Sequence, residues 1–147
     1  MKDEAEPGRP DASSQASEGA PPERAELRER VSAIDERIFL LREVQRQTPF
    51  SIDVMFDRLE ELSAGMERFA YVVDLAGVAR PDARTRTRLK ERILGINARL
   101  AHVGVAIGSN VIIRAVARLV AFASGFPSFS FHESVDEATE ACRRALR

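Results

Sequence analysis

The feature of this sequence that most restricts its fold is the run Phe69–Leu75, which is apolar except for Asp74. It lies between two segments whose apolar residues recur with helical spacing. A strand that is apolar on both of its sides is normally covered on both faces, as it is in α/β proteins. The run therefore predicts a central strand of a sheet that has helices packed against it.

The segments around this run alternate between helix and strand patterns. A helix is expected after Thr48, which with Ser51 is a candidate N-cap, and it should end near Gly65. Its apolar face consists of Ile52, Met55, Phe56, Leu59 and Leu62. Further elements are expected as a helix over 82–100, a strand over 103–107, a helix from Ser109 to Gly125, a strand over 128–131 and a last helix after Ser134. Such alternation implies right-handed crossovers and a mainly parallel sheet of four to five strands, with four helices.

Residues 23–47 allow two interpretations. Leu27, Val31, Ile34, Ile38 and Leu41 follow a helical, heptad-like spacing. The same segment also contains two strand-like stretches, 31–34 and 37–44, with a turn at 35–36. The first interpretation predicts a helix that pairs with another chain, and the second predicts an N-terminal β-hairpin, which we favour.

Composition separates the first 22 residues from the rest. They contain five acidic and two basic residues and no Leu, Ile, Val or aromatic residue, so we expect a disordered tail. Residues 23–147 contain 20 basic and 18 acidic residues and are expected to form one nearly neutral domain. The absence of an apolar leader or a long apolar segment, together with a single cysteine, predicts a cytoplasmic protein without integral membrane association.

The order of elements resembles the STAS domain, the fold of SpoIIAA-like anti-anti-sigma factors. The segment Val72–Val78, followed by Asp82, is similar to the family's central motif, in which a strand ends in Asp-Leu-Ser-Gly-Val and an Asp-Ser pair opens the next helix. The segments 103–109 and 129–134 and the closing helix are more like the STAS/SEC14-type branch of bacterial proteins. The resemblance covers about residues 31–147 and implies a regulatory module that binds a partner protein.

One position departs from the family pattern. In anti-anti-sigma factors a kinase phosphorylates the serine that follows the aspartate at the helix N-terminus, and Ala83 occupies that position here. The usual phosphoserine switch is therefore absent at this residue. Thr85 and Thr87 are nearby hydroxyls, and the sequence does not decide whether either is phosphorylated. Asp82 either caps the helix or provides a permanent negative charge at that place.

Two groups of residues are candidates for binding. Basic residues gather around the second helix and form either an electropositive face or an ordinary solvated one. They are Arg80, Arg84, Arg86, Arg88, Lys90, Arg92 and Arg99. From the resemblance we predict a partner-binding surface made of Arg80, Asp82, Ala83, Arg84, Thr85 and Arg88. Gly108, Ser109 and Asn110 lie at a strand-to-helix turn and could hold an anion or a ligand, although an ordinary loop explains them as well.

The sequence contains no pattern typical of a catalytic or metal site. His102, His132 and Cys142 lack the spacing of metal ligands. Asp74 ends the central strand, where active-site carboxylates are often found, but it has no identifiable acid–base partner. We therefore expect a protein that is not an enzyme and needs no cofactor. The absence of tryptophan and of aromatic residues among the arginines argues against binding to nucleic acid.

Three functions remain open from the sequence. We favour a STAS-like module that docks a partner protein with the surface from Ala79 to Arg88. The SEC14-type resemblance implies binding of a lipid or small apolar ligand near a group of phenylalanines that core packing also explains: Phe122, Phe126, Phe129 and Phe131. The third function is an oligomerising protein that associates through residues 23–47. The sequence leaves the partner's identity and the oligomeric state undetermined.

Overall fold

The computed structural model describes residues 23–108, 114–116, 118 and 128–147 of the chain. Its centre is a sheet of five strands in the order β1-β2-β3-β4-β5. The strands are β1 (Val31–Asp35), β2 (Ile38–Arg42), β3 (Phe69–Asp74), β4 (Leu100–Ala106) and β5 (Phe129–His132). β1 pairs antiparallel with β2, and every later pair is parallel. This arrangement confirms the predicted mainly parallel sheet with an N-terminal hairpin.

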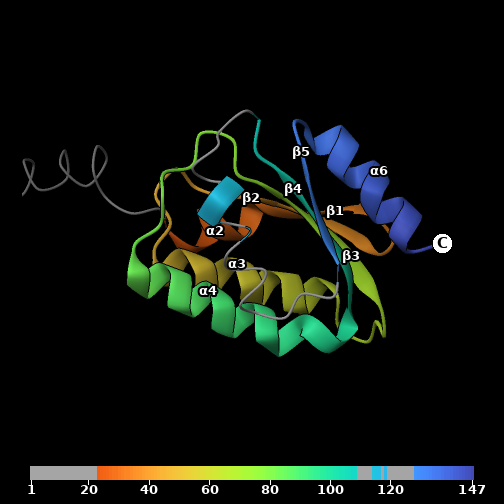
Figure 1. Cartoon of the computed structure of the whole chain (residues 1–147). Coiled ribbons are helices and arrows are strands. Elements are labelled where there is room, and N and C mark those ends of the chain that lie inside the picture. The colour runs from red at the N-terminus through yellow and green to blue at the C-terminus, as the bar shows by residue number, and fades with distance from the viewer. Residues whose placement is uncertain (1–22, 109–113, 117, 119–127) are drawn as a thin grey trace, which may run out of the picture.

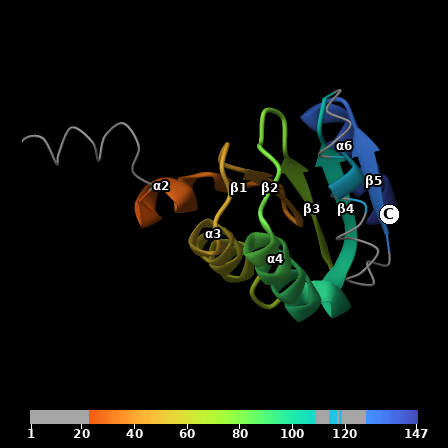
Figure 2. The same ribbon diagram turned by 60° about the vertical axis from the view of Figure 1, so that its left-hand side comes forward.

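Helices cover both faces of this sheet. They are α2 (Arg24–Glu29), α3 (Pro49–Leu62), α4 (Ala83–Ile96), which continues into the 3-10 turn η2 (Asn97–Arg99), and α6 (Val135–Ala145). Residues 114–116 and 118 are also helical, and the rest of the helix predicted after Ser109 lies outside the described residues. α3 and α4 lie side by side on one face and α6 lies on the other (Figure 1). α2 is a short additional helix beside β1 at one end of the molecule (Figure 2).

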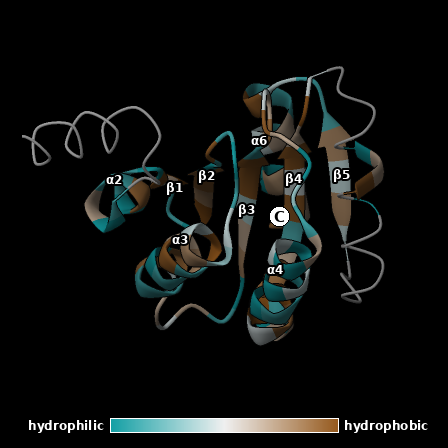
Figure 3. Cartoon of the chain, turned by 90° about the vertical axis from the view of Figure 1, so that its left-hand side faces the viewer, coloured by the Kyte–Doolittle hydropathy of each residue, from teal (hydrophilic) through white to brown (hydrophobic). Residues whose placement is uncertain are grey.

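Apolar residues form one core on each face of the sheet. The larger core lies under α3 and α4 and contains Phe39, Phe56, Phe69 and Tyr71. The smaller core lies under α6 and contains Ile38, Val72 and Cys142. Neighbouring residues of β3 therefore point into different cores, which is the pattern that its apolar run predicts. The strands are mainly hydrophobic, while the outer side of α4 is largely hydrophilic (Figure 3).

The local sequence explains where the main helices begin. Thr48 caps α3, because its side chain accepts a hydrogen bond from the Ser51 backbone N–H, and the Ser51 hydroxyl accepts one from the Thr48 N–H. Ser134 caps α6 by accepting from the Glu137 N–H. The Glu137 carboxylate accepts from the Glu133 N–H and not from the Ser134 N–H, so the reciprocal bond of a capping box is not formed. Thr48 lies after the end of β2, and Ser134 lies after the end of β5, so both helices begin at the carboxyl ends of strands.

The hairpin interpretation of residues 31–44 is confirmed, and the long helix over 23–47 is wrong. Val31 lies opposite Leu41 in the antiparallel ladder, and the chain turns after Asp35. Leu27, in the short helix α2, is completely buried in the core. The apolar residues with heptad-like spacing therefore pack inside the domain. Residues 23–47 do not form the long helix through which the chain was predicted to pair with another chain.

Two predicted boundaries are also wrong. The helix expected to reach Leu100 ends at Ile96, and the strand expected from Val103 begins at Leu100. Leu100 fits the helical spacing, but in the structure it pairs with Phe69 as the first residue of β4. The apolar side chain is buried in either arrangement, so its spacing could not distinguish them. Within the described residues, no helix combines the length and the apolar character required to cross a bilayer.

Candidate functional site

The strands β2, β3 and β4 end at the same edge of the sheet, and the loops that follow them form a surface there. We call this surface the rim and define it as residues 45–50 and 76–91. Two backbone hydrogen bonds hold its loops in place: Ala79 N–H donates to the Gln45 carbonyl at 2.7 Å, and Leu75 N–H donates to the Ala106 carbonyl at 2.8 Å. In parallel α/β sheets ligands commonly bind at this edge. The rim is therefore a candidate binding site.

The N-terminus of α4 lies at the centre of the rim. Asp82 is its N-cap, and its Oδ1 accepts a hydrogen bond from the Thr85 N–H at 2.9 Å. This bond lowers the pKa of the Asp82 carboxyl below its usual range, so the group is ionised at neutral pH. Arg86 donates to the Pro81 carbonyl at 2.8 Å and fixes the preceding loop. Asp82 therefore has the capping role that was one of its two interpretations.

The candidate hydroxyls next to Ala83 differ in their accessibility. Thr85 is completely buried, which places its hydroxyl out of reach of a kinase in this conformation. Thr87 and Ala83 are exposed. Both line an open hollow of about 380 Å³ between α3 and α4, to which Pro49, Arg84 and Arg88 also contribute. The position that carries the phosphoserine in the family is thus displayed in a hollow, although here it has no hydroxyl.

Several of the predicted arginines are engaged in contacts that join α4 to α3. Arg88 forms an ion pair with Asp53 at 2.6 Å and another with Glu91 at 2.9 Å. Arg92 pairs with Asp53 at 3.0 Å and with two further carboxylates of α3. Arg99 donates to the backbone carbonyls of Ser63 and Met66 beyond the end of α3. These arginines fasten α4 and the turn after it to α3, and carboxylates offset the charges of Arg88 and Arg92.

The other basic residues of the rim remain exposed. Arg46, Arg80, Arg84 and Lys90 form no ion pair with any other residue that the structure describes. An exposed aromatic side chain accompanies them: Phe50 is 44% exposed. The rim therefore combines exposed arginines with an aromatic side chain, and arginine and aromatic residues are enriched at protein interfaces.

The predicted anion loop is described only in part. Gly108 has a φ of +61°, which suits glycine at a tight turn after β4. Ser109 and Asn110 lie outside the described residues, as do Phe122 and Phe126. Of the phenylalanines proposed for ligand binding, Phe129 and Phe131 pack edge to face with ring centroids 5.4 Å apart and contact the larger core.

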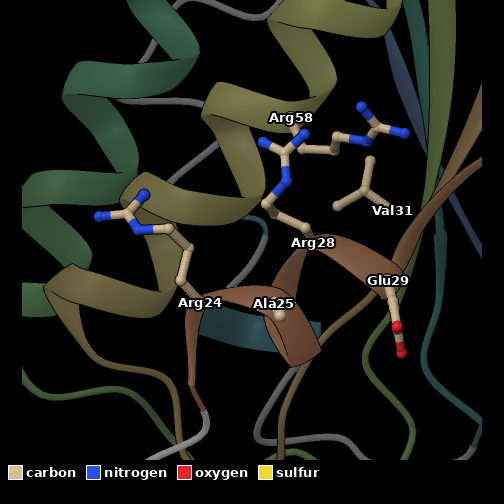
Figure 4. Close-up of a pocket in the computed structure, with 6 residues that line it drawn as sticks. All are labelled: Arg24, Ala25, Arg28, Glu29, Val31 and Arg58. Atoms are coloured by element: carbon tan, nitrogen blue, oxygen red, sulfur yellow. The ribbon is translucent and has the colours of Figure 1, made fainter.

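Another hollow, of about 590 Å³, lies between α2 and α3 and is lined partly by Arg24, Arg28 and Arg58 (Figure 4). Three arginines suggest an anion site, but Glu61 already binds two of them. Arg28 donates to both of its carboxylate oxygens, at 2.9 and 3.0 Å, and Arg58 donates to one at 3.1 Å. These bonds lower the pKa of Glu61 to about 2. The hollow thus contains its own counter-ion and is a weak candidate for a ligand site.

A hydrogen-bonded chain of histidines and serines joins β4 to β5, and sequence reasoning missed it. His102 Nδ1 lies 2.6 Å from Ser128 Oγ, and His102 Nε2 lies 2.8 Å from Ser130 Oγ. Ser130 Oγ is also 2.6 Å from His132 Nε2. Burial lowers the pKa of His102, and the neighbouring charges of His132 and Arg144 lower it further. A neutral imidazole has one N–H donor and one acceptor nitrogen, so both contacts of His102 with serine hydroxyls can be hydrogen bonds.

The remaining candidate residues have structural roles. The Asp74 carboxylate accepts a hydrogen bond from the Ala76 N–H at 3.1 Å and so fixes the loop after β3. Cys142 is completely buried, and burial raises the pKa of its thiol to about 11. In the part of the chain that the structure describes, no group of three or more histidine, cysteine or acidic side chains could hold a metal ion.

Comparison with known proteins identifies the fold. A crystal structure of an uncharacterised protein of the DUF3478 family from Shewanella loihica PV-4, described as having a SpoIIAA-like fold, is similar with a TM-score of 0.61. The match covers 76% of this chain and 90% of that chain, at 16% sequence identity. No model of a known family matches the sequence, and no curated protein matches it either.

The chain therefore has a SpoIIAA-like (STAS) fold, which confirms the resemblance suggested by its sequence. At this level of identity the similarity extends to the fold alone.

Proposed function

We propose that this protein is a non-enzymatic regulatory module of the STAS type that docks a partner protein at the rim, in the cytoplasm and without a phosphoserine. The observation that carries the proposal is the open hollow between α3 and α4, which Ala83 and Arg84 line at the start of α4. The ion pairs between α3 and α4 support it further, because they hold both helix ends in a fixed relative position. A preorganised surface loses little entropy when a partner binds.

The residues available for docking differ in the role we assign to them. Phe50 supplies an aromatic anchor, and Arg80 and Arg84 supply charge that selects an acidic surface on the partner. In the family pattern a phosphate on serine changes how the partner recognises this place. Ala83 removes that control here, so docking is expected not to depend on phosphorylation at this position.

The proposal is tested by affinity purification from the protein's own host with two pairs of variants. Arg84→Glu reverses a charge on the rim, and Arg68→Glu is its control, because Arg68 is exposed at the opposite edge of the sheet. Phe50→Ala removes the anchor, and Leu94→Ala is its control, because Leu94 is 51% exposed outside the rim. Loss of an anchor of this kind should weaken binding by about 2 kcal/mol, or roughly thirtyfold.

We expect both rim variants to lose the partner and both controls to retain it. Equal recovery with Arg84→Glu and Arg68→Glu would refute the proposed surface. Native mass spectrometry of the same preparations tests the alternative function, binding of a lipid or small apolar ligand. A retained ligand would add a defined mass to that of the protein alone.

A further inference from the structure

The rim has a surplus of positive charge. It contains six basic residues and two acidic ones, Asp82 and Glu91. Glu91 pairs with Arg88, and the charged Asp82 carboxylate lies in the field of Arg84 and Arg86. The cations Arg46, Arg80, Arg84 and Lys90 have no ion pair with any residue in the described part of the chain. Exposed like charges close together repel one another, and an acidic group placed among them is stabilised.

The chain enters the folded domain beside this surface. α2 begins at Arg24, and its guanidinium lies 5.5 Å from the centre of the Phe50 ring. Phe50 belongs to the rim and follows Pro49, which lines the hollow. Residues 1–22 are therefore attached next to the rim, because they end two residues before Arg24, which contacts Phe50.

The sequence of residues 1–22 is complementary to the rim in charge. It contains five acidic and two basic residues, and no Leu, Ile, Val or aromatic residue. A chain of 22 residues spans at most roughly 75 Å when extended, so all five carboxylates can reach the rim. A tethered segment of this length is present at its neighbouring site at an effective concentration on the order of millimolar, which favours even a weak electrostatic contact.

We propose that residues 1–22 dock on the rim of their own domain through their acidic side chains and compete there with the partner protein. The regulatory meaning of this contact rests on the proposed function, whereas the contact itself does not. In the family a phosphoserine controls docking at the position that Ala83 occupies here. In this protein, competition by the tethered acidic segment would take the place of that control. Salt weakens the contact, because exposed charges are screened over a distance of about 8 Å at physiological ionic strength.

The contact can be tested in the full chain by paramagnetic relaxation. A nitroxide label is attached to Ala12→Cys, while Cys142 resists labelling because it is buried with a raised pKa. Wild-type protein treated with the same reagent is the control for this selectivity. We expect a loss of amide signal intensity at Phe50 and Arg84 that recovers in high salt.

A second labelled variant carries a neutral tail, in which amides replace all five acidic residues of the segment: Asp3, Glu4, Glu6, Asp11 and Glu18. We expect it to restore the signals of the rim and to increase recovery of the partner. Signal loss that is unchanged in this variant, or that is confined to α2, would overturn the proposal. Signal loss in an isotope-labelled chain mixed with a nitroxide-labelled one would assign the contact to a second copy, and would also overturn it.

The two proposals fail in distinguishable ways. Charge-dependent signal loss combined with equal partner recovery for Arg84→Glu and Arg68→Glu would refute partner docking at the rim and leave the tail contact standing. Charge-independent signal loss would refute the tail contact, whatever the affinity purification shows.

Discussion

Glu43 is a buried carboxylic acid directly after β2, beneath the rim, and its replacement by glutamine should stabilise the protein. Only 8% of the residue is exposed, and Oε1 accepts no hydrogen bond. Burial raises the pKa of Glu43 to about 7, although the Gln47 side chain and the charge of Arg30 act in the opposite direction. Folding thus opposes ionisation of this group at neutral pH.

The size of the effect follows from the change in pKa between the unfolded and folded chain. A rise from 4.5 to about 7, at roughly 1.4 kcal/mol per unit, corresponds to about 3 kcal/mol. The folded protein holds the Glu43 proton more tightly, so its stability from this source is complete below pH 4.5 and is lost as the pH rises through about 7. Above that pH the ionised carboxylate costs the folded state the full amount.

The assay is urea unfolding of wild type and Glu43→Gln, followed by circular dichroism at two pH values. We expect the variant to exceed wild type by about 3 kcal/mol near pH 8 and by only about 1 kcal/mol near pH 5. Glu36→Gln is the matched control, because Glu36 is exposed in the turn between β1 and β2. A difference between wild type and Glu43→Gln that is the same at both pH values would refute the reasoning and show that Glu43 ionises normally inside the protein.

Three further predictions concern the α6 face of the sheet. Gly104→Ala should destabilise the protein by about 1–3 kcal/mol in urea unfolding, because its new Cβ would lie 2.8 Å from the Ala138 carbonyl oxygen; an unchanged midpoint would contradict this packing. Cys142 should react with a thiol reagent only as fast as the protein unfolds, and rapid labelling of the native protein would show that the thiol is accessible. Since burial and nearby charge lower the pKa of His102, wild type should lose stability relative to His102→Gln as the pH falls below 6.5, and parallel pH profiles would contradict this.

The sequence predicted the elements whose evidence is local. Apolar spacing in α3 and the continuous apolar run of β3 are properties of a few neighbouring residues, and the structure contains both elements at the expected positions. The cap Thr48 acts over three residues, so it was also recognisable. The fold class then follows from the order of these elements along the chain.

Features that depend on distant residues could not be predicted in this way. Asp53 and Arg88 are 35 positions apart, and their ion pair exists only because α3 and α4 lie side by side. The contact between His102 and Ser130 likewise depends on the pairing of β4 with β5. Residue types alone predicted either an electropositive or a solvated basic face, whereas in the structure Arg88 and Arg92 form ion pairs with α3.

Partner docking at the rim places Phe50 in contact with the partner. Replacing Phe50 by a photoreactive phenylalanine analogue, in cells of the protein's own host, tests this contact at a single residue. Illumination should yield one discrete cross-linked product, which disappears when Arg84→Glu is added and is absent when the analogue replaces Leu94. Cross-linking that is equal at the two positions, or that is insensitive to Arg84→Glu, would contradict the claim.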